Sequence, residues 1–200
     1  PRGGRRPGRA QRAPEPEAVE QDLDITFMTA VRGGTEHLRM SVNGKSRSID
    51  VTIPRGIASA AKLRVRGDDD VGDIILRIRV GQHPVFRRVE HPGAVADEGL
   101  DLYLDLPLTI AEATLGATVT VPTLETPVHL TVPPGSASGR KLRLRGKGVE
   151  DSKGTRGDLY AVVKIVPPDG KSLSHAEVEH LRAIADHSPA PRSGPNWPSN

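Results

Sequence analysis

The clearest pattern along the chain is an alternation of apolar and polar residues in short stretches separated by turn-forming residues. Side chains of a β-strand point alternately to its two faces, so a period of two is typical of a strand with one buried face. Asn43-Gly44 lies between two of the stretches and favours the positive φ angles of a tight hairpin turn. The pattern predicts strands at residues 23–27, 38–42, 49–53, 74–80, 102–108 and 128–132.

A helical pattern is much rarer along the chain. Ser174 is followed three residues later by Glu177, which predicts a capping box at the start of a helix. This helix is expected to end before Pro189. The apolar residues on one face of the helix are Val178, Leu181, Ile184 and Ala185. Short helical turns are also predicted at residues 28–31 and 111–115.

The chain repeats itself, and a repeat of this size indicates two copies of one structural unit. The corresponding blocks are residues 22–33 with 105–116, 53–67 with 132–146, and 72–74 with 157–159. In the second block the first and last glycines are eleven residues apart in both copies. Each copy comprises about 60–65 residues, for which we expect antiparallel strands in a β-sandwich. The expected fold class is therefore all-β, with two tandem small β-sandwich domains, short helical turns and one C-terminal α-helix.

Glycine and proline mark the ends of the strands in the repeated blocks. Gly56, Gly67, Gly135 and Gly146 are predicted to adopt the positive φ angles that turns require. Pro54 and Pro133 are expected to end the strands that precede them. These motifs therefore specify the fold and do not indicate a binding site.

Composition divides the chain further. Five arginines lie among the first twelve residues, and the first twenty residues have almost no apolar content, which predicts a disordered linker. The predicted organisation is a linker at 1–20, domain I at 21–88, a connector at 89–99, domain II at 100–169, a helix at 170–187 and a disordered tail at 188–200. No stretch is long and apolar enough to predict a transmembrane helix, so a cytoplasmic location is expected.

The sequence gives no indication of an enzyme. The absence of cysteine excludes disulfides, thiolate zinc sites and cysteine nucleophiles. A GKS triplet at residues 44–46 lacks the glycine that a phosphate-binding loop needs five positions earlier, where Arg39 stands. The GSASG stretch at residues 135–139 has Ala137 where a nucleophile elbow requires serine. We therefore expect no catalytic residues, no metal site and no cofactor.

Several motifs, taken together and in order, resemble the C-terminal peptide-binding region of the DnaJ (J-domain co-chaperone) family. They are IPRG at 53–56, KLRVRG at 62–67, HPVFRR at 83–88, LTIAEA at 108–113, LG at 115–116, VPTL at 121–124, VPPG at 132–135, KLRLRG at 141–146 and RGKG at 145–148. The resemblance covers the chain from about Asp22 to Ile184. The cysteine-rich zinc module of one DnaJ class is absent, so the chain resembles the zinc-free class. The J-domain is absent from these residues and is expected to precede them.

The resemblance implies a function in binding unfolded polypeptides and delivering them to a DnaK-type ATP-driven chaperone. In such proteins a groove in the first domain holds apolar segments, which can add as a strand to a sheet edge. The residues that the resemblance assigns to this groove are Leu23, Leu38, Met40, Ile49 and Phe86, with Phe86 as an anchor beneath it. The alternative is that these five side chains are ordinary core residues.

Two further contacts follow from the resemblance. Arg39, Lys45 and Arg47 are candidates for binding the acidic tail of the ATP-driven partner, although charged strand residues are commonly just solvated. Val178, Leu181 and Ile184 are candidates for forming a homodimer, and the alternative is that they pack on their own second domain.

A nucleic-acid-associated protein is the alternative function, because the N-terminal arm is basic and the isoelectric point is about 9.5. Against this interpretation, the arginines have no interleaved aromatic residues on which bases could stack. A structural β-sandwich adhesin is a second alternative, which would need neither the groove nor the linker. The sequence therefore favours a binding module for polypeptides, with nucleic acid and membrane as unexpected partners.

Overall fold

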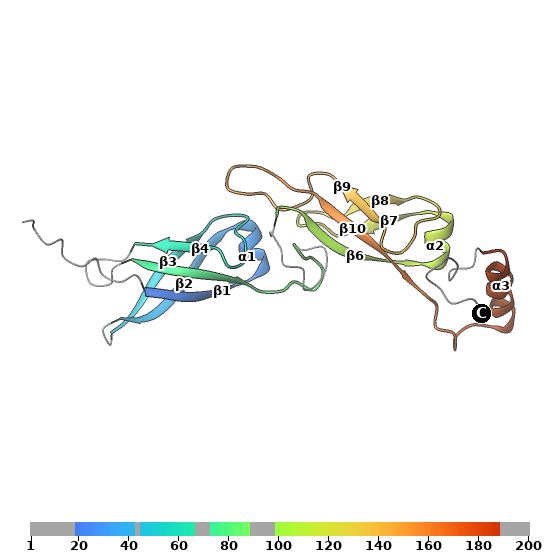
Figure 1. The fold of residues 1–200 in the computed structure, drawn as a ribbon, viewed down its shortest axis with the longest axis horizontal. Coiled ribbons are helices and arrows are strands. Elements are labelled where there is room, and N and C mark those ends of the chain that lie inside the picture. Colours follow the sequence, from blue (N-terminus) through green and yellow to red (C-terminus); the bar gives the residue numbers. More distant parts are fainter. Residues whose placement is uncertain (1–18, 43–44, 67–72, 89–98, 189–200) are drawn as a thin grey trace, which may run out of the picture.

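The computed structural model of the chain describes residues 19–42, 45–66, 73–88 and 99–188. These residues form ten strands and three helices, arranged as two domains that lie end to end (Figure 1). Both domains have the same order of elements: a strand, a short helix, a hairpin and two further strands. The predicted all-β fold with a C-terminal helix is confirmed.

The first domain consists of two small sheets. Its elements are β1 (Val19–Ile25), α1 (Phe27–Arg32), β2 (Gly34–Val42), β3 (Lys45–Ile53), β4 (Lys62–Val65) and β5 (Ile74–Val80). One sheet has the strand order β1-β5-β4, and the hairpin β2–β3 forms the other. Alternate side chains of the two sheets share one buried cluster, which includes Leu23, Leu38, Val51 and Leu76. This packing is the sandwich that the period of two predicts.

The second domain repeats this arrangement. Its elements are β6 (Leu102–Thr109), α2 (Ile110–Leu115), β7 (Ala117–Val121), β8 (Val128–Val132), β9 (Lys141–Leu144) and β10 (Leu159–Val166). The three-stranded sheet has the order β6-β10-β9, and β7–β8 form the hairpin. Its core is the larger of the two and also includes Phe27, Val31 and Phe86 from the first domain. The two domains therefore share apolar contacts across their junction.

The expectation of purely antiparallel strands is wrong for one pair in each domain. β1 runs parallel to β5, with Leu23 opposite Ile78, and β6 runs parallel to β10, with Leu106 opposite Val163. A parallel pair requires a crossover connection, which the short helix, the hairpin and the next strand supply here. The period of two reports which face of a strand is buried and carries no information on the direction of its neighbour.

Both short helices begin at equivalent threonines of the repeat. The hydroxyl of Thr26 accepts a hydrogen bond from the backbone N–H of Thr29, and the hydroxyl of Thr109 accepts one from Glu112. At α2 the carboxylate of Glu112 also accepts from the backbone N–H of Thr109, which completes a capping box. The predicted helical turns at 28–31 and 111–115 are thereby confirmed.

Glycine is required in the repeated blocks for two different reasons. Gly56, Gly135 and Gly146 have φ angles of 78°, 69° and 64°, as predicted, whereas Gly67 lies outside the described residues. At Gly157 the reason is space, because a Cβ atom would lie 2.3 Å from the carbonyl group of Leu100. This glycine therefore lets the start of the second domain pack directly against the loop before β10.

The C-terminal helix α3 (His175–Asp186) begins at the predicted capping box. The hydroxyl of Ser174 accepts from the backbone N–H of Glu177, whose carboxylate accepts from the backbone N–H of Ser174. No side chain of α3 is buried. No helix in the described ranges has the length and apolar character needed to cross a membrane.

Several predicted segments lie outside the described residues. They are residues 1–18 of the predicted linker, the turn at 43–44, residues 89–98 of the connector and residues 189–200 of the tail.

Candidate functional site

The edges of the first domain provide backbone groups that could pair with another strand. Among the described strands, β2 pairs only with β3 and β1 pairs only with β5. The second edge of each strand has no neighbour in that part of the chain, whereas the central strand β5 is paired on both sides. An open edge presents a row of unpaired N–H and C=O groups. An extended peptide can pair with these groups and add to the sheet as a further strand.

Three of the predicted groove residues come together beneath these edges. Leu38 on β2 lies opposite Ile49 on β3, and both pack with Leu23 from the facing sheet. Leu23 and Leu38 are buried, with 8% and 9% of their surface exposed, and Ile49 is half-buried. The side chain of Met40 lies outside what the structure describes. These leucines thus belong to the core of the first domain, and Ile49 is the most accessible of the three.

Phe86 belongs to a different part of the molecule. Its ring stacks on the imidazole of His83 with 5.1 Å between centroids, and the same imidazole contacts the ring of Phe27 on α1. Nδ1 of His83 accepts backbone N–H bonds from Val85 and Phe86, which fixes the turn of the HPVFRR motif. The 7% exposed Phe86 packs with the core of the second domain. The structure therefore does not bring it to Leu23, Leu38 and Ile49.

The candidate basic residues lie on the same hairpin. Arg39 is exposed on β2, opposite Ser48. The side chains of Lys45 and Arg47 lie outside the described atoms, although both residues belong to β3. Close by, Nδ1 of His37 lies 2.5 Å from a carboxylate oxygen of Asp50 across the hairpin. Of the predicted basic residues, Arg39 is therefore the one placed with its side chain in solvent.

Arg88 connects the end of the first domain to the start of the second. Its guanidinium donates to the backbone carbonyls of Gly56 and Ile57 at 3.1 and 2.6 Å, and to that of Gly99 at 3.0 and 3.1 Å. Only 7% of the residue is exposed. The planar fork of arginine suits this role because it can serve several acceptors at once. One buried side chain thus fixes the turn after β3 to the residue that precedes the second domain.

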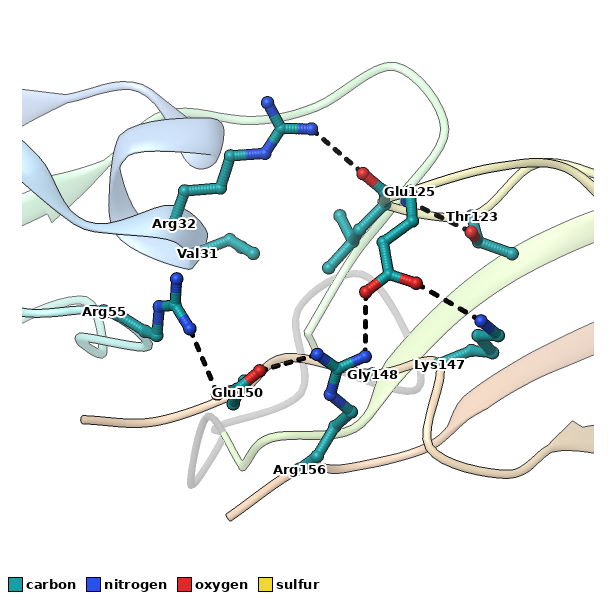
Figure 2. Close-up of a pocket in the computed structure, with 10 residues that line it drawn as sticks. Val31, Arg32, Arg55, Thr123, Glu125, Lys147, Gly148, Glu150 and Arg156 are labelled. Carbon is teal, nitrogen blue, oxygen red and sulfur yellow. Dashed lines mark hydrogen bonds and ion pairs between the residues drawn. The ribbon is translucent and has the colours of Figure 1, made fainter. Parts of the chain in front are cut away.

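Ion pairs surround a cavity of about 380 Å³ at the junction (Figure 2). Arg55 of the first domain donates to Glu150 of the second at 3.0 Å, and Glu150 also accepts from Arg156 at 2.6 Å. Arg156 donates in addition to Glu125 at 2.9 Å, and Lys147 donates to the same carboxylate at 3.3 Å. This row of ion pairs with alternating charge therefore extends from the first domain into the second.

The same contacts set the protonation of the two carboxylates. Hydrogen bonds from Arg156, and then from Lys147, hold the pKa of Glu125 below its ordinary value of 4.5. The pKa of Glu150 is lowered chiefly by the hydrogen bond from Arg156, with Arg55 contributing. Arg32 on α1 completes this side of the junction by donating to the carbonyl of Leu124 at 2.9 Å (Figure 2).

The predicted dimerisation residues lie at the far end of the second domain. Leu181 and Ile184 face a groove of about 560 Å³ between α3, α2 and the segment after β10, and Val178 lies outside the groove lining. Leu181 is half-buried, whereas Ile184 is 58% exposed. This face of α3 thus points toward its own second domain without being buried by it, and dimerisation through it remains a prediction.

Sequence reasoning missed the junction because its partners are distant in the chain. Arg55 and Glu150 are separated by 95 positions, and no local pattern relates them. The HPVFRR motif did supply a signal, since His83, Phe86 and Arg88 all act at the junction. Its compact run of aromatic and basic residues directly after a strand indicates a fixed turn, but the family resemblance assigned Phe86 to the groove instead.

Comparison with known proteins supplies the remaining information. The sequence model of the family described as "DnaJ C terminal domain" matches residues 19–168. The chain is 38% identical over 152 residues to "Chaperone protein DnaJ" of Erysipelothrix rhusiopathiae, covering 72% of the chain and 38% of that protein. It is 36% identical over 166 residues to "Chaperone protein DnaJ 2" of Corynebacterium efficiens, covering 78% of the chain and 39% of that protein.

Other relatives of the chain have a different name. The chain is 39% identical over 153 residues to "Curved DNA-binding protein" of Salmonella arizonae, covering 73% of the chain and 47% of that protein. The chain thus spans less than half the length of these relatives, with coverage between 38% and 47%.

Proposed function

Because the chain belongs to the DnaJ C-terminal domain family, we propose that it is the client-binding region of a co-chaperone. It holds apolar segments of unfolded polypeptides and delivers them to a DnaK-type ATP-driven chaperone. It does so by binding alone and carries out no bond-making step. The observation that supports this proposal most strongly is the open edge of β2 beside the apolar core of the first domain.

Binding at this edge joins two kinds of contact. The client supplies unpaired backbone groups, which the edge of β2 satisfies without regard to sequence. Alternate apolar side chains of the client lie against the side of the hairpin, where Ile49 is half-buried and therefore accessible in part. Because main-chain pairing does not depend on sequence, the site can accept many different clients. The apolar contacts favour segments that are normally buried in folded proteins.

Site-specific photo-cross-linking tests the proposal. A photoreactive amino acid replaces Arg39 on the edge strand β2, and the matched control carries it at Arg77, an exposed position of the central strand β5. A strand added beside β2 places its side chains within about 5 Å of position 39, whereas both sides of β5 are already paired. We expect an apolar peptide to cross-link at position 39 and not at position 77. Equal labelling at both positions would count against an edge-specific site.

Delivery to the ATP-driven partner is proposed to use the basic side of the same hairpin. Arg39 is placed in solvent on β2, where an acidic tail can reach it. A charge contact of this kind weakens with ionic strength because exposed charges are screened over a Debye length. Replacement of Arg39 by alanine would then weaken binding of an acidic peptide while leaving apolar clients bound.

A nucleic-acid function is the second candidate, because several relatives are named curved DNA-binding proteins. The feature of this chain that supports it is the basic stretch with five arginines in the first twelve residues. Binding of nonspecific DNA at several salt concentrations distinguishes the candidates. A steep salt dependence that survives deletion of residues 1–20 would favour a nucleic-acid surface on the folded domains.

A further inference from the structure

The cavity at the domain junction has an excess of positive charge in its lining. Its charged side chains are four basic and two acidic ones, which are Arg32, Arg55, Lys147, Arg156, Glu125 and Glu150. Both carboxylates are ionised at neutral pH, because the neighbouring cations hold their pKa values below the ordinary value of 4.5. The lining therefore has two more positive than negative charges at pH 7.

Contacts within the protein do not neutralise this excess. Arg55, Lys147 and Arg156 share the two carboxylates of the cavity through ion pairs. Arg32 instead donates to the carbonyl oxygen of Leu124, which has no charge. Three cations thus share two carboxylates, and the fourth cation has no carboxylate partner in the part of the chain that the structure describes.

The internal repeat shows that the fold itself does not require these arginines. Arg32 ends the helix α1, and its counterpart at the end of α2 is Leu115. Arg55 lies in the turn after the first hairpin, and its counterpart after the second hairpin is Pro134. Neither counterpart has a charge. Pairing with Glu150 explains Arg55, whereas Arg32 needs another reason for its charge.

The cavity also has room for more than a simple ion. Its volume of about 380 Å³ is in the range of sites that hold small molecules. Val31 and Leu124 contribute apolar surface to the lining. Figure 2 shows Val31 between Arg32 and Arg55, so apolar and cationic groups alternate on the side of the first domain. An anion with a small apolar part therefore matches this lining.

We propose that the cavity binds a small phosphate monoester, with the phosphoryl group between the cations and the organic part against Val31 and Leu124. The charge of a phosphate monoester is about −2 once its second proton has dissociated, near pH 6. Such a dianion balances the excess of two positive charges. The planar guanidinium groups of Arg32 and Arg55 suit phosphate oxygens, to which they can donate two hydrogen bonds at once.

A ligand in this position contacts both domains. Arg32 and Arg55 belong to the first domain, whereas Lys147 and Arg156 belong to the second (Figure 2). Because the ligand binds most tightly when all of these contacts are made, its binding stabilises the arrangement in which the domains meet. This inference goes beyond the proposed function and does not depend on the binding of clients.

Nuclear magnetic resonance of the isotope-labelled complete chain tests the proposal, with phenyl phosphate as the probe at pH 8 and low ionic strength. We expect saturable shifts of the backbone amides of Leu124, Gly148 and Glu150. Phenyl sulfate has nearly the same shape but a single negative charge, so it should bind about tenfold more weakly. Inorganic phosphate should shift the same amides but bind more weakly, because it lacks the apolar part. The absence of saturable shifts at these amides, or equal affinities for phenyl phosphate and either of the other anions, would overturn the proposal.

Two substitutions with opposite expected effects separate binding from any defect in folding. Arg32→Gln should weaken the binding of phenyl phosphate about tenfold, because one charged donor is lost. Glu125→Gln should strengthen it severalfold, because a repelling carboxylate is removed and its partners Lys147 and Arg156 become available to the ligand. The matched control is Arg182→Gln, because Arg182 is exposed on α3 and lies outside the cavity.

The same variants exclude attraction by net charge alone. Arg32→Gln and Arg182→Gln change the net charge equally, and both leave the five arginines among the first twelve residues in place. Equal affinities of these two variants, or a weaker affinity in Glu125→Gln, would overturn the proposal. Client cross-linking at position 39 does not involve the cavity, so its failure and the failure of phosphate binding are distinguishable.

Discussion

At the scale of single residues, Arg88 has a role that depends on both its charge and its shape. It lies buried at the junction and donates to carbonyls of Gly56, Ile57 and Gly99. A hydrogen bond from a charged donor to a carbonyl oxygen contributes to stability, so the side chain stabilises each segment that it contacts. One residue therefore holds neighbouring segments of the two domains together.

The first prediction concerns this residue. Arg88→Met should lower the free energy of unfolding by about 3 kcal/mol, because the backbone carbonyls of Gly56, Ile57 and Gly99 lose a charged donor. Arg88→Lys should recover little of the loss, since a single ammonium cannot reproduce the planar fork. The control Arg79→Met removes an exposed ion pair with Asp22 and should cost less than about 1 kcal/mol. Chemical denaturation measures all three, and equal losses at positions 79 and 88 would contradict the assignment.

Some residue-level predictions could be made from the sequence and others could not. The alternation along β1, β2 and β3 was sufficient to place Leu23, Leu38 and Ile49 on inward-facing positions. The same pattern could not place Phe86, because that residue follows the last strand of the domain and its position depends on how the domains meet. Contacts between the domains join residues that are distant in the sequence, so no local periodicity encodes them.

At the scale of elements, short helices begin where side chains satisfy the first backbone N–H groups. The capping boxes of α2 and α3 consist of Thr109 with Glu112 and Ser174 with Glu177. Hydrogen bonds from the threonine backbone and hydroxyl hold the pKa of Glu112 below its ordinary value, and those from Ser174 do the same for Glu177. These boxes are local in sequence, which is why the start of α3 could be predicted. The parallel pairing of β1 with β5 joins strands that are distant in the sequence, so it could not be predicted from a local pattern.

The second prediction applies to α3. Ser174→Ala removes the hydroxyl that accepts from Glu177 and should cost about 1 kcal/mol of helix stability. Hydrogen exchange of the α3 amides should therefore accelerate about fivefold, while exchange in β6 and β10 stays unchanged. The matched control is Glu179→Ala, which removes only an exposed ion pair with Arg182 and should have a smaller effect. Equal exchange in both variants would show that the cap does not hold the helix.

At the scale of the whole molecule, the junction between the domains combines an apolar and a charged part. Phe27, Val31 and Phe86 extend the core of the second domain into the first. Around them, Arg55, Glu150, Arg156 and Glu125 form the alternating charges shown in Figure 2. Such a junction fixes how the two domains are oriented, and under the proposed function it would set the direction in which a client on the first domain is presented. Exposed ion pairs contribute orientation more than stability.

The third prediction is that acid loosens this junction. The pKa values of Glu125 and Glu150 are lowered in the folded chain. The stabilisation that these ionised carboxylates give to the junction is therefore complete above the ordinary pKa of 4.5. It is lost as the pH falls through the lowered values, when both carboxylates become protonated. The chain has no cysteine, so spin labels can be attached at introduced cysteines, for example at the exposed positions Lys62 and Thr131. Their distance distribution should broaden as the pH falls from 4.5 through the lowered pKa values of Glu125 and Glu150.

A substitution at neutral pH separates the junction from other acid effects. Glu150→Gln should broaden the same distance distribution at pH 7, because it removes the charge shared by Arg55 and Arg156. Glu179→Gln in α3 lies away from the junction and should leave the distribution unchanged. A narrow distribution in the Glu150 variant would mean that the apolar contacts alone set the domain orientation.

Hydrogen exchange with and without an apolar peptide tests most directly whether clients add as a strand to β2. We expect slower exchange of the outward-facing amides in β2 (Gly34–Val42) when the peptide is bound, with no change in the central strand β5 (Ile74–Val80). Protection confined to the second domain, or binding without any protection of β2, would contradict it.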